Sequence, residues 1–541
     1  MLVIAVVLFA LAVFAAACGN NNKGGTTGGG TPKPGGVYNY ALQAEPVCIE
    51  PLNAQESEGS QVCHQCFWGL VNYEEKDGKT VIVPAGAESW DVNDDATVYT
   101  FHLRKGVTFG PPVNREVTAD DYVYSWNRAT DPANQSIVAY ILSPIQGADD
   151  SGYAAKGLTG VKALDPYTLE VTLRYPFAEF PMTLGYTIAA PVPKEYVEKL
   201  GNKEFGDKPV GTGPYMVKEW VHNQKITLVK NPNFWDKDQA GYVETINMPI
   251  YKGSSAADTQ WLDFQSGTID YTMVPPGQVK AAENRPEVKS GEWTAAKYPS
   301  MSVYFVGVNM KNDVVGGADG LPLRQALYYS ADAPNIINVV GENVNLPCQG
   351  YVPPACPGYR PNQSPYGYDV NKAKELLGQI ETVPTLQYWF NTDAEHERVA
   401  TALQAGWEAV GVKIELSNFE WGTFLEKIKG NDHQIFRLGW IGDYPSMDTF
   451  LYPLFQSSQS GYMGNFYNNP EFDALVQKAR STTDETQRNN LYAEAERMAL
   501  KDIPAIPLYF YRDFRVTNNR VKGFQHDMMG FTAMWKLWVE E

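Results

Sequence analysis

The sequence predicts an α/β protein of two lobes, and three features of the chain support this prediction. Residues 37 to about 290 show mostly short, alternating strand patterns separated by turn residues. From Leu323 onward, helical patterns alternate with strand patterns, which is typical of α/β layering. An extended segment, Ile503–Leu508, then leaves the helical region. We infer that two segments cross between the lobes and allow them to close like a hinge.

In the first half of the chain, the predicted strands alternate apolar and polar residues. Thr97–Leu103 and Thr168–Leu173 each place their apolar side chains on one face. A helix over Ala119–Ala129, capped by Thr118, is the one helix predicted in this half.

In the second half, apolar residues at helical spacing predict several helices that are separated by short strands. The predicted helices are Asn371–Leu377, Ala394–Val410, Trp421–Lys429, Asn469–Ala479 and Asp484–Leu500, and the predicted strands are Val412–Leu416 and Ile435–Trp440.

Length and composition are those of a large globular protein. The chain of 541 residues exceeds the size at which one hydrophobic core stops growing, and at about 150 residues per domain it predicts roughly three domains or lobes. It is 44% hydrophobic and 20% charged, as folded proteins usually are. The formal net charge of -18, without a cluster of Lys and Arg, argues against binding to nucleic acid or anionic lipid.

The N-terminus predicts an exported protein. Met1–Ala17 is apolar and uncharged, is shorter than the ~20 residues of a spanning helix, and is typical of a signal peptide. Its small residues before Cys18 resemble a bacterial lipobox, and the resemblance implies that Cys18 is lipidated. An ordinary signal peptide or a membrane anchor is the alternative. Residues 18–36 are rich in Gly, Asn and Thr, and predict a flexible tether.

The remaining cysteines predict disulfides, which exported proteins can keep. Cys348 and Cys356 close a short loop, and we predict a disulfide between them. Cys48, Cys63 and Cys66 supply at most one further bridge. The Cys63–Cys66 cluster lacks the second half of a zinc motif, so we expect a structural disulfide there rather than a metal or redox site.

Several short motifs occur in a fixed order over roughly 400 residues. They are Pro84–Trp90, Tyr99–Phe109, Val117–Ser125, Gly211–Tyr215, Asn231–Trp235, Leu323–Leu327, Gly439–Pro445 and Ile503–Leu508. In this order the chain resembles family 5 of the bacterial solute-binding proteins, which comprises the oligopeptide- and dipeptide-binding proteins of ABC importers.

The resemblance implies the type II fold of periplasmic binding proteins, with a hinge between two lobes. The expected main subdomain of lobe I comprises residues 37–75, 188–298 and 505–541, its accessory subdomain residues 76–187, and lobe II residues 299–504. The crossings are expected near Ala296–Ser302 and Asp502–Pro507.

The resemblance also implies the function of the protein. We expect a monomer that is not an enzyme, that uses no cofactor or metal, and that lies at the outer face of the cytoplasmic membrane or in the periplasm. The expected partners are a peptide ligand and the permease subunits of an ABC transporter.

The motif Gly439–Pro445 is the expected ligand site. It follows the predicted strand Ile435–Trp440, and ligands of open α/β sheets bind beyond the carboxyl ends of strands. The resemblance implies that Asp443 pairs with the α-ammonium group of a peptide, because either charge buried alone would cost several kcal/mol. The alternative is an Asp in a surface turn before Pro445.

Neighbouring residues are expected to complete this site. The resemblance implies that Trp421 and Trp440 line side-chain pockets, and that Arg437 faces the carboxylate of the peptide. The main-chain groups of Gly439 and Ile441 are expected to bond an extended ligand like an added strand. Ordinary packing or a surface ion pair is the alternative for Trp421 and Arg437.

Other functions stay open at this point. The same fold binds oligosaccharides or metal and haem chelates in some relatives, although the six histidines form no cluster in the sequence. A secreted hydrolase would need an acid–base pair, such as Asp443 with Asp448 or Glu420 with Glu426. No nucleophile or phosphate-loop motif accompanies these pairs.

Overall fold

The computed structural model describes residues 31–54, 57–76, 79–136, 138–252, 256–275 and 277–540. The predicted signal peptide, Cys18 and most of the predicted tether lie outside the described residues. Within the described part of the chain, no helix has both the length and the apolar character needed to span a membrane.

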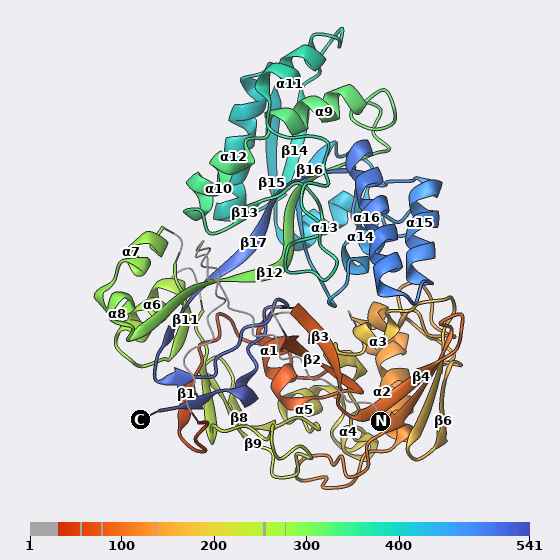
Figure 1. Cartoon of the computed structure of the whole chain (residues 1–541), viewed down its shortest axis with the longest axis vertical. Coiled ribbons are helices and arrows are strands. Elements are labelled where there is room, and N and C mark those ends of the chain that lie inside the picture. Colours follow the sequence, from red (N-terminus) through yellow and green to blue (C-terminus); the bar gives the residue numbers. More distant parts are fainter. Residues whose placement is uncertain are drawn as a thin grey trace, which may run out of the picture.

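Two lobes lie one above the other in Figure 1 and are joined by two long strands, β12 (Trp293–Val308) and β17 (Ala505–Asn518). The two strands run antiparallel and pair in both lobes. The regular pairing breaks between Pro299 and Val303, where the chain passes from one lobe to the other. The predicted two-lobed α/β architecture is therefore confirmed.

Lobe I, the lower lobe of Figure 1, contains two four-stranded sheets, and a third, smaller sheet is a hairpin. In spatial order the first sheet contains β1 (Val37–Asn39), β10 (Thr245–Pro249), β9 (Lys225–Lys230) and β8 (Tyr215–Val221). The second contains β4 (Ala87–Val92), β5 (Val98–Leu103), β7 (Thr168–Thr172) and β6 (Val161–Asp165). The hairpin consists of β2 (Val71–Lys76) and β3 (Lys79–Pro84). Near the C-terminus of the chain, β18 (Val521–Lys522) and β19 (Trp538–Val539) form a separate short pair.

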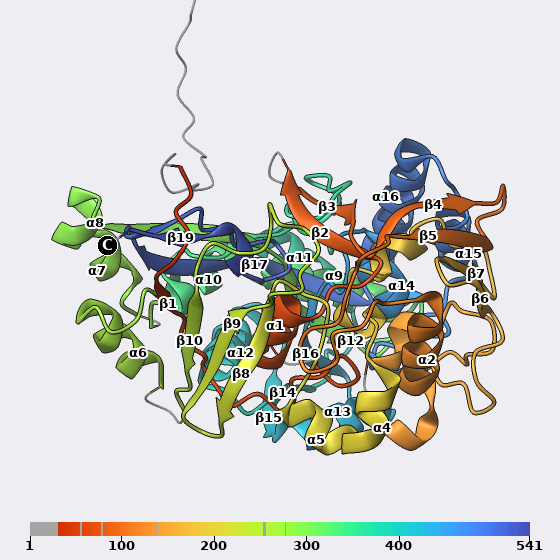
Figure 2. The same ribbon diagram turned by 90° about the horizontal axis from the view of Figure 1, so that it is seen from below.

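The described part of lobe I also contains eight α-helices. They are α1 (Ser57–Cys66), α2 (Ala119–Thr130), α3 (Phe180–Thr183), α4 (Lys194–Leu200), α5 (Asn202–Asp207), α6 (Ala256–Gln265), α7 (Val279–Glu283) and α8 (Pro286–Ser290). Figure 2 views the molecule from below and shows the two four-stranded sheets on opposite sides of α1.

The prediction of a single helix in this half is wrong. The helix α1 was missed because most of its residues are polar although Gly59 to Cys66 are all buried, so the sequence lacks the apolar stripe that usually indicates a packed helix. The helix α2 begins after Thr118 as predicted, and the Thr118 N–H donates to Asp121 Oδ2 at 2.9 Å. The predicted strand faces are confirmed as well, since Tyr99 and Phe101 of β5 are buried.

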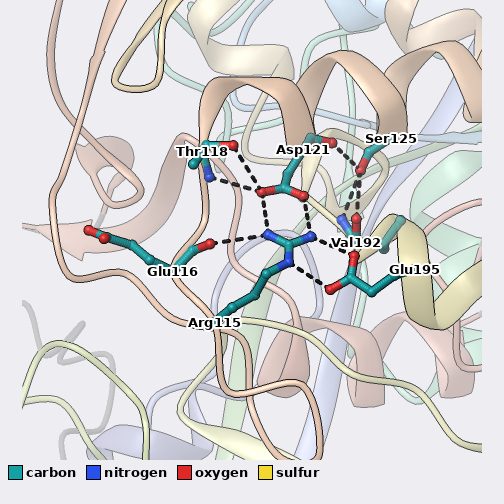
Figure 3. A network of polar contacts seen from close by, with 7 residues as sticks. All are labelled: Arg115, Glu116, Thr118, Asp121, Ser125, Val192 and Glu195. Atoms are coloured by element: carbon teal, nitrogen blue, oxygen red, sulfur yellow. Dashed lines mark hydrogen bonds and ion pairs between the residues drawn. The ribbon is translucent and has the colours of Figure 1, made fainter.

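The start of α2 is tied to α4 by one arginine (Figure 3). Arg115 donates to both carboxylate oxygens of Asp121, at 2.8 and 2.7 Å. It also donates to both oxygens of Glu195 in α4, at 2.6 and 2.8 Å. Asp121 lies in the first turn of α2, where the helix dipole favours a negative charge, and it therefore also anchors the start of the helix.

Lobe II is built around a seven-stranded mixed sheet that shares β12 and β17 with lobe I. Its order is β11 (Tyr271–Met273), β17, β12, β16 (Ile435–Ile441), β14 (Leu386–Asn391) and β15 (Ile414–Phe419), with β13 (Leu346–Pro347) beside β17. The helices are α9 (Leu321–Ser330), α10 (Ala333–Gly341), α11 (Val370–Leu377), α12 (Ala394–Glu408), α13 (Trp421–Lys429), α14 (Asp448–Phe455), α15 (Pro470–Arg480) and α16 (Glu485–Asp502).

Both faces of this sheet are buried in lobe II. On β12, Val303 and Phe305 belong to one hydrophobic core, whereas Tyr304 and Val306 belong to another on the opposite face. Successive residues of a strand point to opposite faces, so an uninterrupted apolar run fits a sheet covered by helices on both sides.

Candidate functional site

The strand β16 has one open edge. On one side it pairs with β12 along its whole length. On the other side, β14 pairs with it only at Ile435 and Phe436. Within the described residues, no strand therefore covers the second edge at Gly439 and Ile441.

The ladder directs the main-chain groups of Gly439 and Ile441 toward this open edge. The N–H of Gly442 donates to the C=O of Met301, beside β16, at 2.7 Å. Bonded and non-bonded positions alternate in an antiparallel pair, so Gly439 and Ile441 fall at positions that do not bond to β12. Their N–H and C=O groups are thus placed to pair with an added extended chain.

Asp443 lies on a short loop beyond the end of β16 and meets lobe I. Its N–H donates to Thr449 Oγ1 in α14 at 3.0 Å, which fixes the loop. The residue is half-buried, and its carboxylate accepts a hydrogen bond from the hydroxyl of Tyr140. Tyr140 lies on a single 3₁₀ turn of lobe I, Ala139–Leu142, so the carboxylate lies between the lobes.

Among the described residues, no cation offsets the burial of Asp443. Burial raises the pKa of Asp443 to about 7, and the hydrogen bond from Tyr140 offsets this only in part. No Lys or Arg of the described residues contributes to this pKa shift. Ionised Asp443 would therefore be stabilised by a cationic group that the ligand brings.

Arg437 is a buried guanidinium whose described hydrogen-bond partners are neutral. It is 8% exposed and donates to Asn391 Oδ1 at 3.0 Å and to the hydroxyl of Tyr511 at 3.4 Å. Its guanidinium carbon lies 4.9 Å from the ring centroid of Tyr304. Its Nε has no hydrogen-bond partner among the described residues, so this guanidinium has a free donor for an anionic group of a ligand.

His396 lies beside Arg437 and stays neutral at physiological pH. Its ring centroid is 5.7 Å from that of Tyr304. Burial, followed by the charge of Arg437, lowers the pKa of His396 to about 4. A second positive charge next to Arg437 is therefore not expected at neutral pH.

Three further residues were expected to contact the ligand, namely Trp440, Trp421 and Ile441, and they lie in different surroundings from Arg437. Trp440 packs toward the core on the face of β16 opposite to Arg437, because the two residues are an odd number of positions apart. Trp421 begins α13, is 49% exposed, and stacks on Phe424 with ring centroids 6.0 Å apart. Ile441 is 63% exposed at the end of β16.

Sequence reasoning missed the residues that meet the site from elsewhere in the chain. Tyr140 contacts Asp443 from lobe I, Tyr511 contacts Arg437 from β17, and His396 lies beside Arg437. They lie in no motif with Asp443, and we find no pattern in the sequence that would have indicated them.

The disulfide predicted between Cys348 and Cys356 is not present, since both are free, buried thiols. The loop between them is held instead by Glu496, whose Oε1 accepts from the N–H groups of Tyr351 and Val352 at 2.8 and 3.0 Å. Cys66 is also a free thiol, and burial raises its pKa to about 12.

The described part of the chain also shows where the residues considered for the alternative chemistries lie. It contains no group of three or more His, Cys, Asp or Glu side chains placed to hold a metal ion. Asp448 is 0% exposed and is paired with Arg480, with 3.5 Å between Asp448 Oδ1 and Arg480 Nε. Glu426 is paired on the surface with Lys429.

Comparison with known proteins identifies the family. Residues 81–462 match the bacterial extracellular solute-binding proteins, family 5 Middle. The chain is similar to the oligopeptide-binding protein OppA of Bacillus subtilis (strain 168), with 32% identity over 503 residues, 90% of this chain and 89% of the relative. It is also similar to the periplasmic oligopeptide-binding protein OppA of Escherichia coli (strain K12), with 32% identity over 500 residues and 88% of each chain covered.

The fold is shared with solved structures of such proteins. One is the ABC transporter-associated periplasmic binding protein DppA from Helicobacter pylori in complex with the peptide STSA. The similarity has a TM-score of 0.77 with 27% identity, and covers 94% of this chain and 99% of that chain. The expected type II fold is therefore confirmed, and the chain belongs to family 5 of the bacterial extracellular solute-binding proteins.

Proposed function

We propose that this protein is the extracytoplasmic substrate-binding component of an ABC transporter, and that it binds oligopeptides or dipeptides between its lobes and delivers them to the permease. One observation supports this proposal above the others. A single strand, β16, combines an open backbone edge with a carboxylate beyond its end that has no cationic partner among the described residues, and with a buried guanidinium on one face. A peptide has the complementary groups, namely a backbone, an ammonium group and a carboxylate.

In the proposed bound state, the peptide lies along the edge of β16 at Gly439 and Ile441. Its α-ammonium group meets Asp443, where it replaces or joins the hydroxyl of Tyr140. Its carboxylate meets Arg437, directly or through water. Closure of the lobes removes water from these charges, which strengthens their interaction.

We further propose that the protein binds its ligand without transforming it. The relatives are substrate-binding proteins. The carboxylate pairs that a hydrolase would use are engaged, because Asp448 pairs with Arg480 and Glu426 with Lys429. Lipidation at Cys18, attachment to the outer face of the cytoplasmic membrane and a monomeric state complete the proposal, and they rest on the sequence alone.

Native mass spectrometry of the protein as purified tests the proposed function. We expect masses above that of the bare chain, and these added masses should be released on unfolding as peptides that are identified by fragmentation. A protein that retains nothing, and that also shows no heat of binding with Ala-Ala-Ala or Ala-Ala-Ala-Ala in calorimetry, would contradict peptide binding. Binding of cellobiose or haem in the same assay would favour an alternative ligand within the family.

A further inference from the structure

A second contact between the lobes lies away from the β12–β17 connection. Glu179, in lobe I just before α3, is 3% exposed. Its Oε1 lies 3.2 Å from Arg488 Nε, and its Oε2 lies 3.0 Å from the hydroxyl of Tyr492. Both partners lie on α16 of lobe II, and Figure 1 shows α15 and α16 directly above α3.

The same hydroxyl connects this contact to Asp448. Tyr492 lies 2.9 Å from Asp448 Oδ1, and Asp448 Oδ2 accepts a hydrogen bond from Tyr444 at 2.8 Å. Arg480, the last residue of α15, pairs with Asp448 at 3.5 Å. The chain of contacts thus runs from Glu179 in lobe I to the loop that contains Asp443.

Arg480 also attaches the neighbouring segment of lobe I. Its C=O accepts from the N–H of Ala178 at 2.7 Å. Its guanidinium carbon lies 4.3 Å from the ring centroid of Phe177 in lobe I and 3.8 Å from that of Tyr452 in lobe II. Both the side chain and the main chain of Arg480 therefore join lobe II to this segment of lobe I.

In this network the ion pair of Glu179 with Arg488 crosses between the lobes, so it is complete only while the lobes touch. Two carboxylates and two guanidinium groups are shut away from water, with Glu179 3%, Asp448 0%, Arg480 3% and Arg488 5% exposed. A buried ion pair adds little net stability when it is complete, but loss of one partner leaves a buried charge without compensation. Such a network therefore determines how the lobes are positioned relative to each other, and adds little to the free energy that holds them together.

We infer that Glu179, Asp448, Arg480, Arg488 and Tyr492 form an interlobe latch, which assembles when the lobes close and positions the Asp443 loop for the ligand. The latch residues touch no part of the proposed ligand site directly, so they are positioning residues. The inference rests on the proposed function for its effect on the ligand, whereas its effect on lobe closure is independent of any ligand.

The variant Arg488→Met tests the latch, because it leaves Glu179 buried without its cation. Small-angle X-ray scattering of the ligand-free protein should show a larger radius of gyration than the wild type. Calorimetry with Ala-Ala-Ala-Ala should show an affinity about tenfold lower, since fewer molecules are closed. The double variant Glu179→Gln with Arg488→Met, which removes both charges, should recover the scattering and most of the affinity.

A matched control is a buried ion pair that lies within lobe I. Arg128 Nη1 lies 2.6 Å from Glu50 Oε1, with side chains that are 8% and 4% exposed. Arg128→Met should lower the melting temperature without changing the scattering or the affinity. If Arg488→Met does not fold, Tyr492→Phe removes the shared hydroxyl at almost unchanged volume and should shift both measurements in the same direction.

Unchanged scattering in Arg488→Met and in Tyr492→Phe would overturn the latch, whatever the ligand. So would an enlarged radius of gyration that the double variant fails to reverse, because this would indicate general damage. Absence of peptide binding in the wild type would contradict the proposed function instead, and the ligand-free scattering would still decide the latch.

Discussion

At the scale of single residues, the charge state of Asp443 determines what the site can bind. Burial raises the pKa of Asp443 to about 7 in the ligand-free protein, so near neutral pH a large fraction of the carboxyl groups is protonated. A raised carboxyl pKa means that the folded protein holds the proton more tightly than the unfolded chain. The stabilisation that this proton provides is complete below about pH 4 and is lost as the pH rises toward 7. An ammonium group of a ligand, in contrast, binds the ionised form of Asp443.

We therefore expect peptide affinity to fall as the pH is lowered from 8 to 6. The decrease should approach about tenfold per pH unit below pH 7, because each binding event must then release a proton. Calorimetry in two buffers of different ionisation enthalpy measures this release. Burial holds the pKa values of Tyr73, Tyr140 and Tyr444, which interact with Asp443, far above this range, whereas burial also raises the pKa of Asp527 to about 7. Asp527→Asn should keep the pH dependence of the affinity, and Asp443→Asn should flatten it. The reverse result would show that Asp527, and not Asp443, causes the pH dependence.

Arg437 gives a second prediction at this scale. Replacing it with Met should reduce the affinity for Ala-Ala-Ala-Ala by roughly 2–5 kcal/mol, because the ligand carboxylate would lose its cation in a buried position. The carboxy-terminal amide of the same peptide, which has no such charge, should bind the wild type and the variant with similar affinity. Calorimetry of the four combinations measures the coupling, and equal losses for both peptides would indicate that Arg437 only packs.

At the scale of elements, β16 should bind backbone rather than side chains. Ile441→Pro removes one N–H that points to the open edge and leaves the bonds to β12 in place. The affinity for Ala-Ala-Ala-Ala should decrease by about 0.5–1.5 kcal/mol, the usual value of one hydrogen bond, with a small change in melting temperature. Trp440→Pro is the matched control, since the N–H of residue 440 belongs to the ladder with β12 and its loss should destabilise the fold. Full affinity in Ile441→Pro would show that no ligand bond forms at this position.

The sequence predicts the elements of lobe II well and those of lobe I less well. The helix α13 has the predicted bounds because its apolar residues recur at helical spacing and Gly430 follows it. The helix α1 was missed because it buries mainly polar residues and therefore shows no apolar stripe in the sequence. The pairing of Cys348 with Cys356 was wrong, because a short sequence spacing does not fix where a loop places two thiols.

In the candidate site, too, the residues that are close in the sequence were predicted and those that are distant in the sequence were not. The strand–loop motif indicated Asp443 and the open edge of β16, since both lie within a few residues of one another. Tyr140 lies about 300 residues earlier in the chain, and its contact with Asp443 depends on how the lobes meet. Residue patterns describe local structure, so contacts across the lobes could not be predicted from them.

At the scale of the whole molecule, ligand binding and folding are linked. A peptide that binds only the folded, closed protein should stabilise it by about 2.7 kcal/mol at a concentration of 100 times its dissociation constant. Differential scanning calorimetry should show this as a melting temperature that rises with peptide concentration. The amino-terminally acetylated peptide, at the same concentration, should cause a much smaller rise. A rise that is equal for both peptides would mean that the ammonium group is not recognised.

The central claim is that Asp443 recognises the ammonium end of a peptide, and one double comparison tests it most directly. Calorimetry should be performed with Ala-Ala-Ala-Ala and its N-acetyl form on the wild type and on Asp443→Asn. We expect the wild type to prefer the free amine by roughly 10²-fold or more, and the variant to lose most of this preference. If the wild type binds both peptides equally, or if Asp443→Asn keeps the full preference, the account of how this protein recognises its ligand is contradicted.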